Sequence, residues 1–167
     1  YHDPSPFSMC RVGLAPCAPF SVSPGLMKEV AQQAKKWGVR LHTHLAETLD
    51  EDEYCLTRYK MRPIDFIASV GWLEGNAWLA HMVCLKPEEV RRLSATRTGL
   101  THCPSSNLRL GSGIAPIREY LDAGVPVGLG VDGSASNDSG DMLAEVRMAM
   151  LVHRVRTGVK SMSARDA

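Results

Sequence analysis

The chain has 167 residues, of which 44% are hydrophobic and 22% are charged, and its formal net charge is +1. This composition is typical of a globular protein that buries a core. Lysine and arginine are scattered, and no apolar run approaches the ~18 residues of a transmembrane helix, so the sequence supports neither a nucleic-acid-binding protein nor a membrane protein.

The cysteines indicate the redox environment. There are five of them, an odd number, and no two form a C-x-x-C pair. This pattern favours free thiols over a disulfide framework, and we expect a cytoplasmic protein.

Short apolar runs alternate with helix signals along the chain. The runs predict strands over 11–15, 39–44, 77–81, 98–102 and 127–132. Between them we expect a helix from Ser23-Pro24 to Gly38, a polar helix over 48–60, helices that begin at Pro63, Pro87 and Pro116, and a long helix over 141–157. This alternation predicts an α/β fold with a parallel sheet and right-handed crossovers.

The helical period also predicts which side chains face the core. In the first and the last helix these are, in order, Leu26, Val30, Ala34 and Trp37, and then Met142, Val146, Ala149 and His153. Residues 102–107 are predicted to form a loop that Pro104 makes rigid.

Four polar residues come at the ends of predicted strands: His44, His81, His102 and Asp132. In a (β/α)8 barrel the carboxyl ends of the strands open onto one face, where active sites lie. Three imidazoles and a carboxylate at such a face indicate a metal-assisted catalytic centre. A complete barrel takes about 250 residues, so we expect residues 1–167 to hold only part of one, cut at both ends.

The sequence leaves two interpretations of His44 open. His42 and His44 lie two apart on a strand, point to the same side of the sheet, and together could chelate one metal ion. In the alternative, which the stretch His44-Leu-Ala-Glu47 favours, His44 is the ligand and Glu47 carries a proton of the attacking water. His42 is then a histidine that lines the barrel and bonds to a neighbour.

The other polar residues also have plain structural interpretations. A histidine that ends an apolar strand, as His81 does, is often a hydrogen-bonded core residue, and an aspartate before glycine, as Asp132 is, often caps a turn. Their shared position at strand ends favours a catalytic role instead. His102 beside Cys103 could suggest a soft metal site, but the signature of the zinc cytidine deaminases is absent.

Taken together, six motifs resemble those of one family, the deaminases of the amidohydrolase superfamily. They are Pro19-Phe20-Ser21, His42-Thr-His-Leu-Ala-Glu47, Leu79-Ala-His81, Thr101-His-Cys-Pro-Ser-Ser-Asn107, Gly130-Val-Asp-Gly133, and Ser136-Asn137 with Asp141-Met142. The resemblance is greatest to the branch that holds 8-oxoguanine deaminase, hydroxydechloroatrazine ethylaminohydrolase and S-adenosylhomocysteine deaminase. It covers nearly the whole chain, as strands four to eight of the family's distorted, TIM-like (β/α)8 barrel.

The resemblance implies roles for particular residues. His44 and Asp132 match metal ligands, Glu47 matches the proton-carrying glutamate, and His81 matches the histidine that stabilises the attacked centre; Asp132 also accepts a proton. The loops that line the substrate pocket are those of Cys17 and Asn107. The family's first-strand H-x-H pair has no counterpart here, and we expect it upstream of Tyr1, with strands one to three and a small β-sandwich domain.

The function that the resemblance implies is metal-dependent removal of an amino group from a small N-heterocyclic molecule. We expect one divalent ion, zinc with iron as the alternative, because histidine and aspartate ligands discriminate weakly between them. The expected substrate is 8-oxoguanine, giving urate and ammonia, with a hydroxytriazine, guanine or an adenosine derivative as the alternative. A non-catalytic half-barrel is the alternative from another class of protein. A homo-oligomer stays open, and the segment 1–167 alone is expected to be inactive.

Overall fold

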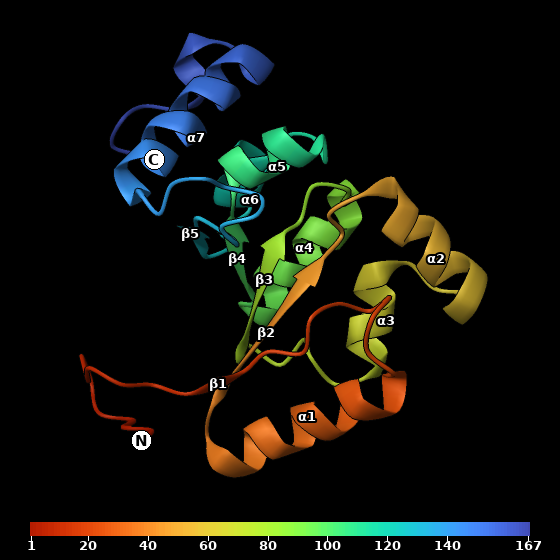
Figure 1. Cartoon of the computed structure of the whole chain (residues 1–167). Coiled ribbons are helices and arrows are strands. Elements are labelled where there is room, and N and C mark those ends of the chain that lie inside the picture. The colour runs from red at the N-terminus through yellow and green to blue at the C-terminus, as the bar shows by residue number, and fades with distance from the viewer.

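A computed structural model describes residues 1–167 as five strands and seven α-helices (Figure 1). The strands are β1 (Gly13–Leu14), β2 (Arg40–Leu45), β3 (Ala77–His81), β4 (Gly99–His102) and β5 (Val127–Leu129). The helices are α1 (Pro24–Trp37), α2 (Leu49–Tyr59), α3 (Pro63–Ser69), α4 (Pro87–Thr96), α5 (Pro104–Leu110), α6 (Ile117–Asp122) and α7 (Met142–Thr157). None of the helices is both long and apolar enough to cross a bilayer.

The five strands form one parallel sheet in the order β1-β2-β3-β4-β5. Neighbours in the chain are therefore neighbours in the sheet, as in consecutive strands of a (β/α)8 barrel. The N-terminal segment leads into β1 at one edge of the sheet, and α7 lies beyond β5 at the other edge (Figure 1). The predicted α/β fold with a parallel sheet is confirmed.

Strand β2 shows how the sheet separates core from site. Leu41, Thr43 and Leu45 are fully buried, whereas His42 and His44 alternate with them and are half-buried on the opposite face. Leu41 and Leu45 join a core of 23 buried residues that also includes side chains of α1, α3, α4 and α6. The apolar face of β2 thus anchors the strand and leaves the two imidazoles on the other side.

The predicted helix ends are well reproduced. The Ser23 hydroxyl caps α1 by accepting a hydrogen bond from the Leu26 backbone at 3.3 Å, and Pro24 occupies the first position. Gly38 ends the helix in the left-handed region, with φ at 66°, where glycine carries no steric penalty.

Two predictions of which helix residues face the core are partly wrong, and so is the prediction of a loop at 102–107. In α1 the buried residues are Met27, Ala31 and Ala34, while Leu26 and Trp37 are about half exposed, because the face toward the sheet is rotated by one residue. In α7 Ala149 and His153 are buried as predicted, but Met142 is exposed.

The predicted loop at 102–107 instead enters a helix, α5, which begins at Pro104 and ends before Gly111 in the left-handed region. The same proline-to-glycine signal that predicted α1 was present here.

A network of buried charges links helices α2, α3 and α4. The Arg62 guanidinium contacts Asp52 at 2.5 Å and Glu89 at 2.6 Å, and it donates to the Cys84 carbonyl at 2.8 Å. The side chains of all three charged residues are less than a fifth exposed. This network ties α2 and α4 to the residue that precedes α3, and loss of one partner would leave a buried charge uncompensated.

A pair of buried histidines links α7 to the sheet. The Nε2 atoms of His102, at the end of β4, and His153, in α7, lie 3.3 Å apart, and each residue is only 1% exposed. Burial lowers the pKa of His102 to about 3 and that of His153 to about 4. Both imidazoles are therefore neutral at physiological pH.

This pair predicts a pH-dependent stability. The ordinary histidine value is 6.5, so between pH 6.5 and 4 the unfolded chain binds protons that the folded chain does not. The free energy of unfolding is retained above pH 6.5 and falls as the pH drops toward the lowered values. Urea titrations of the intact protein should show this decline, and His153→Gln should make it shallower. The control His2→Gln should leave it unchanged; equal slopes in His153→Gln and the unaltered protein would contradict the prediction.

Candidate functional site

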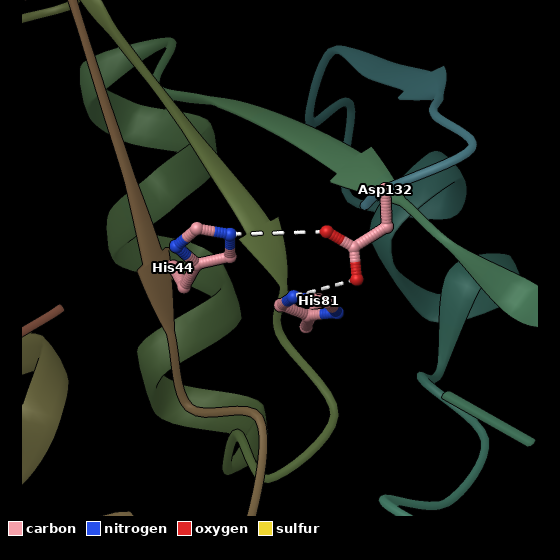
Figure 2. Close-up of side chains that lie close together, drawn as sticks. All are labelled: His44, His81 and Asp132. Atoms are coloured by element: carbon pink, nitrogen blue, oxygen red, sulfur yellow. Dashed lines mark ion pairs between the residues drawn. The ribbon is translucent and has the colours of Figure 1, made fainter. Parts of the chain in front are cut away.

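Three side chains meet at the carboxyl edge of the sheet (Figure 2). His44 lies near the end of β2, His81 is the last residue of β3, and Asp132 follows β5. One ligand atom from each lies within 4.8 Å of the others. His44 Nε2 is 3.9 Å from Asp132 Oδ1, and His81 Nε2 is 3.9 Å from Asp132 Oδ2. The structure therefore brings together three of the four strand-end residues that the sequence analysis selected.

Unusual backbone turns direct these side chains. His81 and Asp132 have φ values of 72° and 62°, and Ala46 and Met82 have values of 50° and 52°. Residues other than glycine rarely occupy this left-handed region, because their Cβ atoms crowd the backbone. Hydrogen bonds between the turns oppose this cost, with Met82 donating to the Leu45 carbonyl at 3.1 Å and Cys84 to that of Ala46 at 2.8 Å.

The His44 ring is oriented by a backbone carbonyl. Its Nδ1 atom lies 2.7 Å from the Cys17 oxygen, so Nδ1 carries the proton and Nε2 offers its lone pair toward Asp132. Such a hydrogen bond on the other ring nitrogen is usual for a histidine that binds a metal. The same oxygen accepts hydrogen bonds from the His44 backbone at 3.0 Å and from the Thr43 hydroxyl at 2.9 Å. Cys17 thus contributes to this region through its backbone.

Asp132 is held as a carboxylate. Its Oδ2 atom accepts hydrogen bonds from the hydroxyls of Ser106 at 2.5 Å and Ser136 at 3.0 Å. Partial burial acts to raise the pKa of Asp132, but these bonds and one from the Gly133 backbone outweigh it, so the pKa lies below its ordinary value. Oδ1 is left facing His44.

His81 and Asn107 form a buried pair behind the mouth of the site. The His81 Nδ1 atom lies 2.7 Å from Asn107 Oδ1, and both residues are 1% exposed. With the amide oxygen as acceptor, Nδ1 carries the proton and Nε2 points toward Asp132 and Glu47. The predicted pocket residue Asn107 therefore lies behind His81, where it orients that ring.

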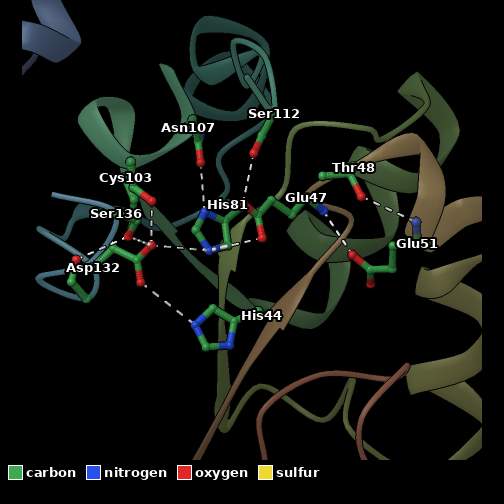
Figure 3. A network of polar contacts seen from close by, with 12 residues as sticks. His44, Glu47, Thr48, Glu51, His81, Cys103, Asn107, Ser112, Asp132 and Ser136 are labelled. Carbon is green, nitrogen blue, oxygen red and sulfur yellow. Dashed lines mark hydrogen bonds and ion pairs between the residues drawn. The ribbon is translucent and has the colours of Figure 1, made fainter. Parts of the chain in front are cut away.

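Glu47 lies beside the three residues, in the turn between β2 and α2 (Figure 3). Its Oε2 atom is 3.7 Å from His81 Nε2, and its Oε1 atom accepts a hydrogen bond of 2.8 Å from the Ser112 hydroxyl. A carboxylate at this place can exchange protons with whatever occupies the space before His44, His81 and Asp132.

Two histidines that the sequence analysis considered as candidate ligands, His42 and His102, lie outside this group of three. His42 stacks on Trp78 with ring centroids 4.9 Å apart, and its Nδ1 atom lies 3.1 Å from the Trp78 carbonyl oxygen. Burial lowers the pKa of His42. This is the hydrogen-bonded, barrel-lining arrangement that the sequence analysis gave as one of two alternatives. His102 pairs with His153 instead, as described above.

Sequence reasoning did not find the polar residues that support the site. Ser106 and Ser112 bond to Asp132 and Glu47, and Glu51 and Glu145 are nearly fully buried acids. For Glu51 a signal existed, because Thr48-x-x-Glu51 has the form of a helix capping box. The serines offered none, since their partners lie 26 and 65 residues away.

The donor set fits a divalent metal ion. Two imidazole nitrogens and one carboxylate oxygen suit zinc, and ligands at its usual bond lengths lie roughly 3–4 Å apart. The separation of 3.9 Å between His44 Nε2 and Asp132 Oδ1 agrees with this spacing, while His81 Nε2 lies 3.9 Å from the other carboxylate oxygen, Oδ2. The hydrogen bond from His44 to the Cys17 carbonyl supplies the usual outer support.

Known proteins resemble the chain over most of its length. Residues 5–167 match the Amidohydrolase family. The 8-oxoguanine deaminase of Pseudomonas aeruginosa is 51% identical over 96% of this chain and 36% of its own length. An isoxanthopterin deaminase from an unknown prokaryotic organism is 46% identical over 95% of this chain and 33% of its own. A zinc complex of atrazine chlorohydrolase from Arthrobacter aurescens TC1 superposes with a TM-score of 0.94, at 41% identity, over 99% of this chain and 37% of that one.

The chain belongs to the amidohydrolase family, and it spans about a third of the length of the curated relatives it matches.

The geometry predicts different effects for the two histidines of β2. In the intact protein, His44→Asn should sharply reduce the bound metal, because Nε2 of His44 faces Asp132, whereas His42→Asn should leave the metal content close to normal. Elemental analysis of both purified variants makes the comparison, with circular dichroism to verify folding. An equal loss of metal in the two variants would restore the paired H-x-H interpretation.

Proposed function

We propose that this chain provides metal-binding and proton-carrying residues of a metal-dependent aminohydrolase in the amidohydrolase family. The observation that carries the proposal is the meeting of His44, His81 and Asp132, with Glu47 beside them, at the carboxyl edge of a parallel sheet. Active sites of such barrels lie at this edge. Deaminases among the relatives support the reaction class.

His44 and Asp132 are the residues that would bind the ion. Zinc is the ion in the atrazine chlorohydrolase complex, and we propose it here with iron as the alternative. A bound divalent ion supplies a Lewis acid that lowers the pKa of water toward neutrality.

The protein's own groups then move protons. Asp132 Oδ1 and Glu47 Oε2 accept protons from the attacking water as its oxygen bonds to the ring carbon that bears the amino group. Glu47 passes a proton to the adjacent ring nitrogen, while His81 Nε2 stabilises charge at the attacked centre. The amino group takes the proton held by Asp132, its carbon–nitrogen bond breaks and it leaves as ammonia, while the other proton of the water stays on the ring nitrogen.

Among substrates we favour 8-oxoguanine, which this reaction converts to urate. The support is the 51% identity to the deaminase of that name over 96% of the chain. Isoxanthopterin, S-adenosylhomocysteine and a triazine are the alternatives, since relatives with those names also match.

Removal of the Glu47 carboxylate tests the proton-carrying role. In the full-length, metal-loaded protein, Glu47→Gln should lower kcat by about 100-fold or more, because a general acid and base is lost while the side-chain shape is kept. Metal content should stay normal. Glu53→Gln, on the exposed side of α2, is the matched control and should be nearly as active as the unaltered protein. Normal turnover in Glu47→Gln would show that Glu47 carries no proton in the reaction.

A substrate panel tests the reaction. The intact, zinc-loaded protein should release ammonia from 8-oxoguanine with kcat/KM at least about 10-fold above that for isoxanthopterin, S-adenosylhomocysteine or a hydroxytriazine. Coupled ammonia detection and the ultraviolet spectrum of urate provide the measurement. A higher value for another substrate would replace 8-oxoguanine, and no release from any of them would contradict the aminohydrolase.

A further inference from the structure

The carboxylate of Glu47 is held by a residue far away in the sequence. The Ser112 hydroxyl lies 2.8 Å from Glu47 Oε1 and donates to it. Ser112 follows the end of α5, and its backbone donates to the Asn107 carbonyl at 2.9 Å. The segment that contacts Glu47 is therefore joined to the one whose Asn107 side chain orients His81 (Figure 3).

The backbone of Glu47 is held from the opposite side by Glu51. The Glu51 Oε2 atom accepts a hydrogen bond of 3.0 Å from the Glu47 backbone, and the Thr48 hydroxyl accepts one of 3.3 Å from the Glu51 backbone. These bonds close the turn that starts at Ala46, whose φ of 50° is unfavourable for alanine.

Glu51 is 3% exposed and forms no ion pair, and its other oxygen is buried without a partner. The Glu51 side chain therefore bonds only to the backbone of this turn. We take this as a sign that its role is to hold the turn.

These contacts make the two carboxylate oxygens of Glu47 unequal. Oε1 already accepts from Ser112, whereas Oε2 faces His81 Nε2 at 3.7 Å. A donor hydroxyl stabilises negative charge on the oxygen it contacts, so an arriving proton is placed on the other oxygen. Resting on the proposed function, we propose that Ser112 and Glu51 are positioning residues for Glu47, and that Oε2 is the atom that carries the proton.

Glu51 serves this role as a hydrogen-bond acceptor of the right length, and its negative charge is not required. Burial raises the pKa of Glu51 to about 7, so the neutral acid is accessible near physiological pH. A neutral carboxyl or amide group still offers a carbonyl oxygen to the Glu47 backbone. Glutamine should therefore replace Glu51, and alanine should not.

The first experiment varies Ser112 in the full-length, metal-loaded protein with 8-oxoguanine, or with the best substrate of the panel. Ser112→Ala should lower kcat about 10-fold, since a misplaced acid–base group reacts slowly, and should leave KM within about 2-fold, a split typical of an interaction made only in the transition state. Ser112→Thr keeps a hydroxyl and should recover most of kcat. Ser94→Ala, which removes another half-buried hydroxyl that donates to a carbonyl, is the control and should change neither.

The proposal for Ser112 is overturned if Ser112→Ala retains kcat, if KM alone rises, or if Ser112→Thr is as slow as Ser112→Ala while it folds and binds metal.

The second experiment varies Glu51. Glu51→Gln should retain kcat within about 3-fold, whereas Glu51→Ala should lose about 10-fold or more through the relaxed turn. Glu53→Ala in the same helix is the control. Should Glu51→Ala fail to fold, Glu51→Gln remains informative, because a large loss of kcat in that folded variant would show that charge, and not shape, is required, and would overturn the proposed role.

A double-mutant cycle separates this proposal from the proposed function. If Ser112 acts through Glu47, Ser112→Ala should cause no further loss of kcat in a Glu47→Gln background. An additive loss, measured on the residual turnover of Glu47→Gln, would overturn the positioning role even where Glu47 carries the proton. A fully active Glu47→Gln would instead overturn the proton-carrying function, and Oε2 with it.

Discussion

Strands β2 and β3 pair so that His44 lies beside Ala80 and Leu45 lies beside His81. Because the strands are parallel, both chains leave the sheet at the same edge, and β4 and β5 continue the same direction. This pairing brings one ligand atom from each of His44, His81 and Asp132 within 4.8 Å of the others, although 88 residues of chain separate the first from the last. Backbone hydrogen bonds of the sheet thus bring the three residues to one edge, and hydrogen bonds of their own side chains orient them there.

The edge of the sheet combines strain with support. Left-handed turns at Ala46, His81 and Asp132 cost about 1–2 kcal/mol each, and they direct side chains away from the paths that the strands would otherwise follow. The compensating bonds come from other segments, such as those that Ser106 donates to Asp132 and Ser112 to Glu47. Strain at this edge therefore persists because several elements determine the turns together.

The opposite side of β2 supplies rigidity. Leu41 and Leu45 are fully buried in the core, and the Arg62 network joins the helices that follow β2 and β3. The two faces of β2 thus differ in function. The apolar face packs in the core, and the face with His42 and His44 points toward the candidate site. Because successive side chains alternate, neither set can shift without the other.

Local pattern was enough to predict the five strands, most helix ends and the strand ends at His81 and His102. Apolar runs, Pro24 and Gly38 act through neighbouring backbone, so the sequence alone determined them. It favoured His44 over His42 without deciding between them, and it gave no sign that Ser112 holds Glu47. The contact between Ser112 and Glu47 joins segments 65 residues apart, and only the tertiary fold brings them together. Tertiary structure decided the site because hydrogen bonds depend on distance in space, which the order of residues does not specify.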